Sequence, residues 1–112
     1  AMFASTKKLD NLFVIIDQNG WQGIGKTKDI LNVKSFKKKW NSFGWNCFEI
    51  NGHDHKKIEK AFKLKKNGKP TAIIAKTIKG KGISFMENDN NWHYRIPTNV
   101  EAQLSKKELG IK

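Results

Sequence analysis

The sequence has few of the residues that mark several classes of protein. Cys47 is its only cysteine, so no internal disulfide can form, and its place in an alternating apolar and polar run predicts a small buried core residue. No window approaches the run of about 18 uncharged apolar residues that a membrane helix needs. The N-terminus also lacks the basic-then-apolar order of a secretory signal. We therefore expect no membrane partner and a cytoplasmic location.

Arginine is almost absent, although the chain is strongly basic. Of 112 residues, 22 are basic and 10 acidic, which gives a net charge of +12, but 21 of the basic residues are Lys and only Arg95 is Arg. Such a charge is typical of proteins that bind nucleic acid or another anionic partner. A phosphate-binding surface favours arginine, because the planar guanidinium matches phosphate geometry. With 11 Asn residues beside the lysines, the composition instead indicates codon bias on the surface. A stand-alone basic module that binds nucleic acid or an anion is kept as an alternative function, and no nucleic-acid partner is expected.

The length and apolar content indicate one folded domain. A chain of 112 residues is too short for a self-contained multidomain enzyme. Its 38% hydrophobic and 11% aromatic residues exclude a wholly disordered basic tail.

Segments typical of strands and helices alternate along the chain. β-branched and apolar runs predict strands over residues 12–16, 46–50 and 71–76, the first of them buried on both faces. Helical periodicity over residues 36–43 follows Ser35 as an N-cap and stops at Gly44.

A second helix is predicted between the second and third strands. Asp54 is its expected N-cap, its apolar stripe holds Ile58, Ala61 and Phe62, and it is predicted to end at Asn67 and Gly68. Alternation of strand and helix favours an α/β fold in three layers, with a parallel sheet of about three strands and flanking helices.

The two ends of the chain differ from this alternating region. The first eleven residues resemble the tail of a helix that begins before residue 1, so an upstream part is expected to be missing. Residues 83–112 are expected to form a loop, polar and rich in Asn over 86–98, and a terminal helix over 101–109. We therefore predict that residues 1–112 form a single partial domain.

The segment Gly20–Thr27 matches the triphosphate-binding pattern G-x-x-x-x-G-K-[ST] and follows a predicted strand. Three residues intervene between that strand and Gly20, the helical signal after Thr27 is weak, and no later strand ends in an acidic residue for magnesium. A nucleotide binder of this kind is therefore a less favoured alternative.

Other candidate residues follow the predicted strands, where open α/β sheets bind ligands. The amide oxygen of Asn19 is a ligand type that magnesium accepts beside a diphosphate, but Asn-Gly is also a common turn. Lys79–Gly82 could hold an anion or form a flexible turn. His93 lies in an aromatic loop and is the best functional histidine, whereas His53 and His55 lack a third metal ligand at a fitting spacing.

Taken together, these segments resemble the N-terminal thiamine-diphosphate-binding domain of transketolase, in particular the short N-terminal subunit of split transketolases. The resemblance runs in order across nearly the whole chain and is carried by Met2–Ser5, Lys8–Leu12, Val14–Gly23, Phe43–Trp45, Asn51–Asp54, Gly68–Thr71, Lys76–Gly82, Phe85–Asn88 and Trp92–Arg95. It also covers the triphosphate-like pattern. The resemblance implies a partial thiamine-diphosphate-binding fold. It also implies a role in carbohydrate metabolism.

The resemblance implies a role for several residues. Asn19 and the backbone carbonyl of Trp21 would ligate the Mg²⁺ that is bound to thiamine diphosphate. Gly20 would let the backbone pass close to the phosphates. Lys79, followed by Gly80, would pair with diphosphate oxygens. His93 matches the family's histidine near the diphosphate and the donor sugar, and is the expected catalytic residue.

The chain also departs from the family pattern. The family's cofactor motif opens with Gly-Asp-Gly, which these 112 residues do not contain, so the aspartate ligand of Mg²⁺ is missing. The glutamate that activates the cofactor lies, in the family, on another domain or subunit. The resemblance therefore implies a fragment of a transferase of two-carbon ketol (glycolaldehyde) units between sugar phosphates, inactive in isolation. Its expected partners are a C-terminal subunit or domain that carries the pyrimidine-binding part, and further copies of itself.

Overall fold

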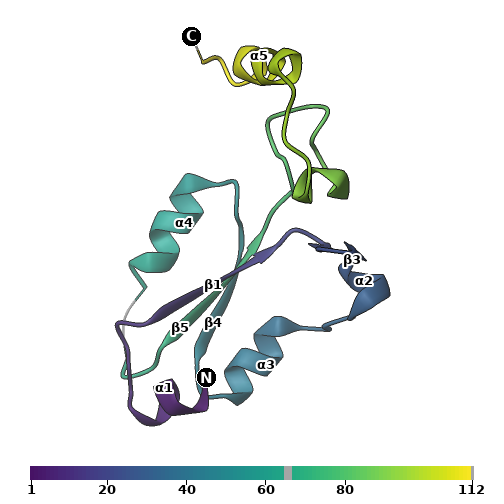
Figure 1. Ribbon diagram of the computed structural model, residues 1–112. Coiled ribbons are helices and arrows are strands. Elements are labelled where there is room, and N and C mark those ends of the chain that lie inside the picture. Colours follow the sequence, from purple (N-terminus) through teal and green to yellow (C-terminus); the bar gives the residue numbers. More distant parts are fainter. Residues whose placement is uncertain (65–66, 112) are drawn as a thin grey trace. The chain divides into compact units, whose positions relative to one another are not determined.

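The structure is a computed structural model that describes residues 1–64 and 67–111 and divides into two compact units. The first unit comprises Ala1–Gln18 and Val33–Thr77, and the second comprises Asn19–Asn32 and Ile78–Lys112. The first unit holds a sheet of three strands: β1 (Phe13–Gln18), β4 (Asn46–Asn51) and β5 (Thr71–Lys76) (Figure 1).

The three strands are parallel and are arranged in the order β1-β5-β4. The register pairs Phe13 with Thr71 at one end and Gln18 with Lys76 at the other. The central strand β5 is buried from Thr71 to Ala75, as a strand covered on both faces should be. The predicted α/β class with a parallel sheet of three strands is confirmed.

Helices cover both faces of this sheet. Helices α1 (Met2–Thr6) and α3 (Phe36–Ser42) lie on one face, and α4 (His55–Phe62) lies on the other (Figure 1). The core beneath α1 and α3 is formed by Ala4, Trp45, Cys47, Ala72 and Ile74, with Leu9, Val14, Ile16, Phe36 and Trp40 packed against it. On the opposite face, the rings of Phe13 and Phe62 lie 5.1 Å apart.

Both predicted helix N-caps are confirmed. The Ser35 hydroxyl accepts a hydrogen bond from the Lys38 amide at 3.3 Å, and the Asp54 carboxylate accepts one from the Lys57 amide at 3.1 Å. Gly44, with φ +84°, follows the end of α3 in the left-handed conformation that glycine favours. Helix α4 ends at Phe62, before the predicted end at Asn67, and residues 65 and 66 lie outside the described residues.

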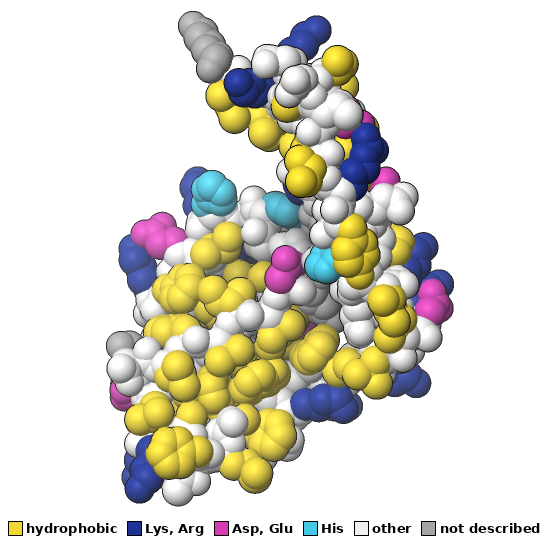
Figure 2. Space-filling view, viewed as in Figure 1, with side chains coloured by type: hydrophobic (Ala, Val, Ile, Leu, Met, Phe, Trp, Pro, Cys, Tyr) yellow, Lys and Arg dark blue, Asp and Glu magenta, His cyan; other side chains and the backbone are white. Residues whose placement is uncertain are grey.

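The prediction that the first strand is buried on both faces is wrong. Strand β1 lies at an edge of the sheet, and Ile15 is 57% exposed because α4 covers only part of that face. Asp17 is exposed as well. Figure 2 shows hydrophobic side chains gathered over the first unit, where a soluble monomer would usually place polar ones.

The second unit consists of short elements. It holds the antiparallel strands β2 (Trp21–Gln22) and β3 (Gly25–Lys26), helix α2 (Thr27–Ile30), the 3₁₀ helix η1 (Asn90–His93) and helix α5 (Asn99–Glu108). The 3₁₀ helix lies within the segment predicted as a loop, and α5 matches the predicted terminal helix. Its capping box lowers the pKa of the Glu101 carboxyl, mainly through the Thr98 backbone amide. None of the helices in the described residues is long and apolar enough to cross a bilayer.

Candidate functional site

Two neighbouring strands of the first unit end side by side. Gln18 pairs with Lys76 in the register of β1 and β5, and the Thr77 amide donates a hydrogen bond to the Gln18 carbonyl at 3.4 Å. The Thr77 hydroxyl also donates to the Asp17 carboxylate. Open α/β sheets bind ligands at this carboxyl edge. From here the chain continues directly into the two segments of the second unit, which begin at Asn19 and Ile78.

The first of these segments begins with a tight turn. The amide oxygen of Asn19 accepts a hydrogen bond from the Trp21 backbone amide at 2.9 Å. The Gly20 carbonyl accepts one from the Thr27 amide, also at 2.9 Å. An amide oxygen has two lone pairs, so Asn19 keeps one for a cation while it closes the turn. The turn and the metal-ligand interpretations of Asn19 are thus compatible.

The segment that matches the triphosphate-binding pattern forms a β-hairpin. Trp21 pairs with Lys26 and Gln22 with Gly25, and the Lys26 ammonium lies 5.5 Å from the centre of the Trp21 ring. The following helix, α2, has only four residues. A triphosphate-binding loop instead wraps its backbone amides around phosphates at the start of a longer helix.

The second segment passes through a crowded glycine. Gly80 has φ +72°, and a Cβ on it would lie 2.4 Å from the Met86 carbonyl oxygen. Of the two lysines that flank Gly80, Lys81 is 3.2 Å from the Glu87 carboxylate. No ion pair is found for Lys79 within residues 1–64 and 67–111. Lys79 is therefore the cation of this loop that remains available to an anion.

The 3₁₀ helix lies beside the hairpin. The Tyr94 hydroxyl and the Asn90 side-chain amide both donate to the Gly23 carbonyl, at 2.9 Å and 3.0 Å. The exposed His93 ring packs edge-on against Tyr94, with ring centroids 4.7 Å apart. A Cβ on Gly23 would lie 3.2 Å from the Tyr94 hydroxyl, which is tight, and 3.5 Å from the His93 Nε2, which is an ordinary contact distance. His93 is thereby held next to the hairpin that carries Trp21.

These segments are connected by side chains that no sequence pattern predicted. The Trp21 indole donates to the Asn88 side-chain oxygen at 2.8 Å, and the Asn88 amide donates to the Lys79 carbonyl at 2.8 Å. Asn88, Asn90 and Tyr94 thus bring the hairpin, the Lys79 loop and η1 together within the second unit. The only signal in the sequence is the Asn-rich composition of residues 88–91.

The donor set suits magnesium only in part. Among the described residues there is no group of three or more His, Cys, Asp or Glu side chains that could hold a metal ion. His53 and His55 are exposed. An amide oxygen from Asn19 and a backbone carbonyl from Trp21 are hard oxygen ligands, which Mg²⁺ accepts when phosphate oxygens and waters complete its octahedron. The two candidate ligands named here, Asn19 and Trp21, are thus neutral oxygens.

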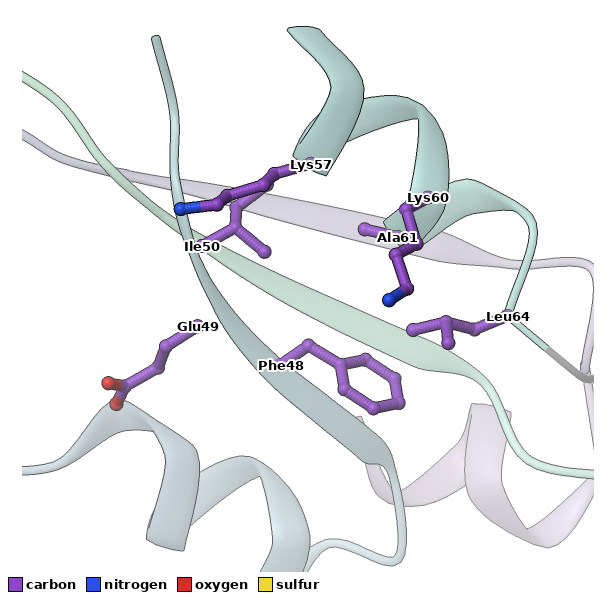
Figure 3. A pocket seen from close by; sticks show the side chains of 7 residues that line it. All are labelled: Phe48, Glu49, Ile50, Lys57, Lys60, Ala61 and Leu64. Carbon is purple, nitrogen blue, oxygen red and sulfur yellow. The ribbon is translucent and has the colours of Figure 1, made fainter. Parts of the chain in front are cut away.

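Two other features of the first unit carry no site chemistry. A depression of about 220 Å³ between α4 and β4 is walled by Phe48, Ile50, Ala61 and Leu64, with Lys57 and Lys60 beside it (Figure 3). It contains none of the predicted site residues. Cys47 is 6% exposed, and burial raises the pKa of its thiol, so the unreactive core role predicted for it is favoured.

Comparison with known proteins identifies the family. A family model described as "Transketolase, thiamine diphosphate binding domain" matches residues 1–112. The chain belongs to this family. It is 42% identical over 110 residues to one of the subunits of apulose-4-phosphate transketolase from Actinobacillus succinogenes, and 38% identical over 105 residues to human transketolase. The crystal structure of transketolase from Campylobacter jejuni superposes with a TM-score of 0.90 at 31% identity.

The chain corresponds to only part of each of these transketolases. The alignments cover 97% of this chain but 40% of the Actinobacillus protein, and 91% of this chain but 16% of human transketolase. The Campylobacter superposition covers 99% of this chain and 18% of that one. Family membership therefore concerns the thiamine diphosphate binding domain, and the 112 residues span less than half of these relatives.

We predict that Gly80→Ala perturbs the Lys79 loop far more than Gly110→Ala. Both glycines have positive φ, +72° and +66°, but the Gly110 Cβ would meet nothing within 4 Å. The control therefore measures the cost of the left-handed conformation alone, about 1–2 kcal/mol. Gly80→Ala adds the overlap with Met86. Amide hydrogen exchange over residues 79–88 checks this, and equal protection of that segment in the two variants would contradict it.

Proposed function

We propose that the second unit contributes the diphosphate and magnesium side of a thiamine diphosphate site. The observation that carries this proposal is that hydrogen bonds through Asn88 join Trp21 to Lys79. The His93 ring packs against Tyr94, whose hydroxyl donates to Gly23 of the same hairpin. The Asn19 amide oxygen and the Trp21 carbonyl are proposed as Mg²⁺ ligands. Family membership supports the cofactor, and the oxygen donor set supports the metal.

Each further residue has a distinct role in this proposal. The Lys79 ammonium pairs with diphosphate oxygens, because Glu87 already neutralises Lys81. Gly20, where a Cβ would meet nothing within 4 Å, lets the backbone approach the phosphates. Gly80 lets the loop that carries Lys79 pass close to the Met86 backbone. His93 donates a hydrogen bond to the diphosphate or to the donor sugar.

When bound, thiamine diphosphate would supply the carbanion chemistry for transfer of a two-carbon ketol unit between sugar phosphates. The residues of this chain bind and orient it. Because the sequence holds no Gly-Asp-Gly and the two proposed metal ligands are neutral, we propose that the 112-residue chain alone has no transferase activity. It would act in the cytoplasm with a second subunit or domain that binds the pyrimidine end of the cofactor. The Actinobacillus relative is named as one subunit of its transketolase, which supports such a partner.

Titration calorimetry tests the cofactor assignment. The chain is expected to bind thiamine diphosphate in the presence of Mg²⁺, and Lys79→Ala is expected to weaken binding by about tenfold or more, since a hydrogen bond to a charged group contributes about 1.5–3 kcal/mol. Lys81→Ala is the matched control, with a smaller expected effect. Removal of Mg²⁺ with a chelator should abolish most of the binding.

Titration calorimetry with other ligands tests the two alternative functions, triphosphate binding and nucleic-acid binding. Tight binding of ATP with Mg²⁺ that is lost in Lys26→Ala would show the triphosphate-binding alternative to be correct. Binding of a DNA duplex that weakens steeply between two salt concentrations would favour the nucleic-acid alternative.

We also propose that the chain self-associates through the apolar sheet face that α4 covers only in part. Ile15 is 57% exposed there, on the edge strand β1. Sedimentation velocity is expected to show dimers or larger species at high protein concentration, and Ile15→Lys is expected to shift them toward monomer. A wild-type chain that stays monomeric throughout would contradict this proposal.

A further inference from the structure

One residue of the second unit touches both proposed cofactor-binding segments. The Asn88 side-chain oxygen accepts a hydrogen bond from the Trp21 indole at 2.8 Å. Its backbone amide donates to the Lys79 carbonyl, also at 2.8 Å. Asn88 therefore bridges the residue whose carbonyl is the proposed Mg²⁺ ligand and the residue whose ammonium is the proposed diphosphate partner.

The backbone of Asn88 restricts which residues can take its place. Its φ is +58°, in the left-handed region that asparagine, aspartate and glycine adopt at little cost and that other side chains avoid. Only asparagine and aspartate combine that conformation with a short side-chain oxygen that can accept from the indole. The structure thus depends on both the left-handed backbone of Asn88 and its side-chain oxygen.

The hairpin is also held at Gly23, two residues after Trp21. Asn90 and Tyr94 donate to the Gly23 carbonyl, so side chains from residues 88–94 hold the hairpin at two places. The Trp21 backbone amide is bound in turn by Asn19. Trp21 is thus held at two points, its indole by Asn88 and its backbone amide by Asn19.

We propose that Asn88 is a positioning residue that fixes Trp21, and with it the hairpin, in the conformation that the cofactor site requires. This inference rests on the proposed function. Asn88 acts through Trp21 and Lys79 and does not itself touch the cofactor. Its loss should loosen Trp21 first and weaken cofactor binding as a consequence.

Asn88→Gly and Asn88→Asp separate the backbone role from the side-chain role. Glycine keeps the left-handed backbone and removes the acceptor, so the chain should still fold. Aspartate keeps both. In the cofactor-free chain, NMR should show the Trp21 indole proton exchanging faster with solvent in Asn88→Gly and as slowly as in the wild type in Asn88→Asp. Unchanged exchange in Asn88→Gly would overturn the inference.

Calorimetry with thiamine diphosphate and Mg²⁺ then tests the consequence for binding. Asn88→Gly is expected to weaken binding about fivefold, the factor that corresponds to one hydrogen bond of about 1 kcal/mol. Trp21→Phe, which removes only the indole donor, should weaken it by a similar factor. The double variant should bind no more weakly than either single variant, because both remove the same contact.

The outcomes distinguish this inference from the proposed function. Fully additive losses in the double variant, or wild-type affinity in Asn88→Gly, would overturn the positioning role while thiamine diphosphate binding stands. A wild-type chain that does not bind the cofactor would overturn the proposed function. The indole exchange would then decide by itself whether Asn88 fixes Trp21.

Discussion

The parallel pairing of β1 with β5 is the constraint on which the candidate site depends. The pairing sets Gln18 beside Lys76, so both strands end at one edge of the sheet. The chain leaves that edge twice, once into the turn at Asn19 and once toward Lys79. A shift of register would separate the starting points of these two segments. Burial of β5 from Thr71 to Ala75 makes such a shift costly, because β5 is the strand that both neighbours pair with.

The second unit is held together by a different kind of interaction. None of its described residues is fully buried, so its fold depends on hydrogen bonds and ring contacts more than on an apolar core. Trp92 illustrates this, because its indole donates to the Phe85 carbonyl at 3.0 Å while its ring lies 4.3 Å from the Arg95 guanidinium. Segments with little apolar burial open at low free energy, and binding loops are often of this kind.

Local signals in the sequence predict the three strands and the starts of helices α3 and α4. The strands at 46–51 and 71–76 follow from apolar and β-branched runs, and the caps at Ser35 and Asp54 follow from side chains that bind amides three residues away. Burial of β1 could not be predicted in this way, because the exposure of Ile15 depends on which strands lie beside it. The contact of Trp21 with Asn88 joins residues 67 apart in the chain, beyond the reach of any periodicity. The candidate site residues were predicted from a resemblance to a family. The structure adds the hydrogen bonds and ring contacts that hold them.

Mg²⁺ and a diphosphate are proposed to meet at the turn that begins with Asn19. Mn²⁺ takes the same oxygen ligands and broadens the NMR signals of nearby nuclei. In the presence of thiamine diphosphate, Mn²⁺ is expected to broaden the amide signals of Asn19, Gly20 and Trp21 most strongly, followed by those around Lys79. Strongest broadening at His53 and His55, or no selective broadening at the Asn19 turn, would contradict the account.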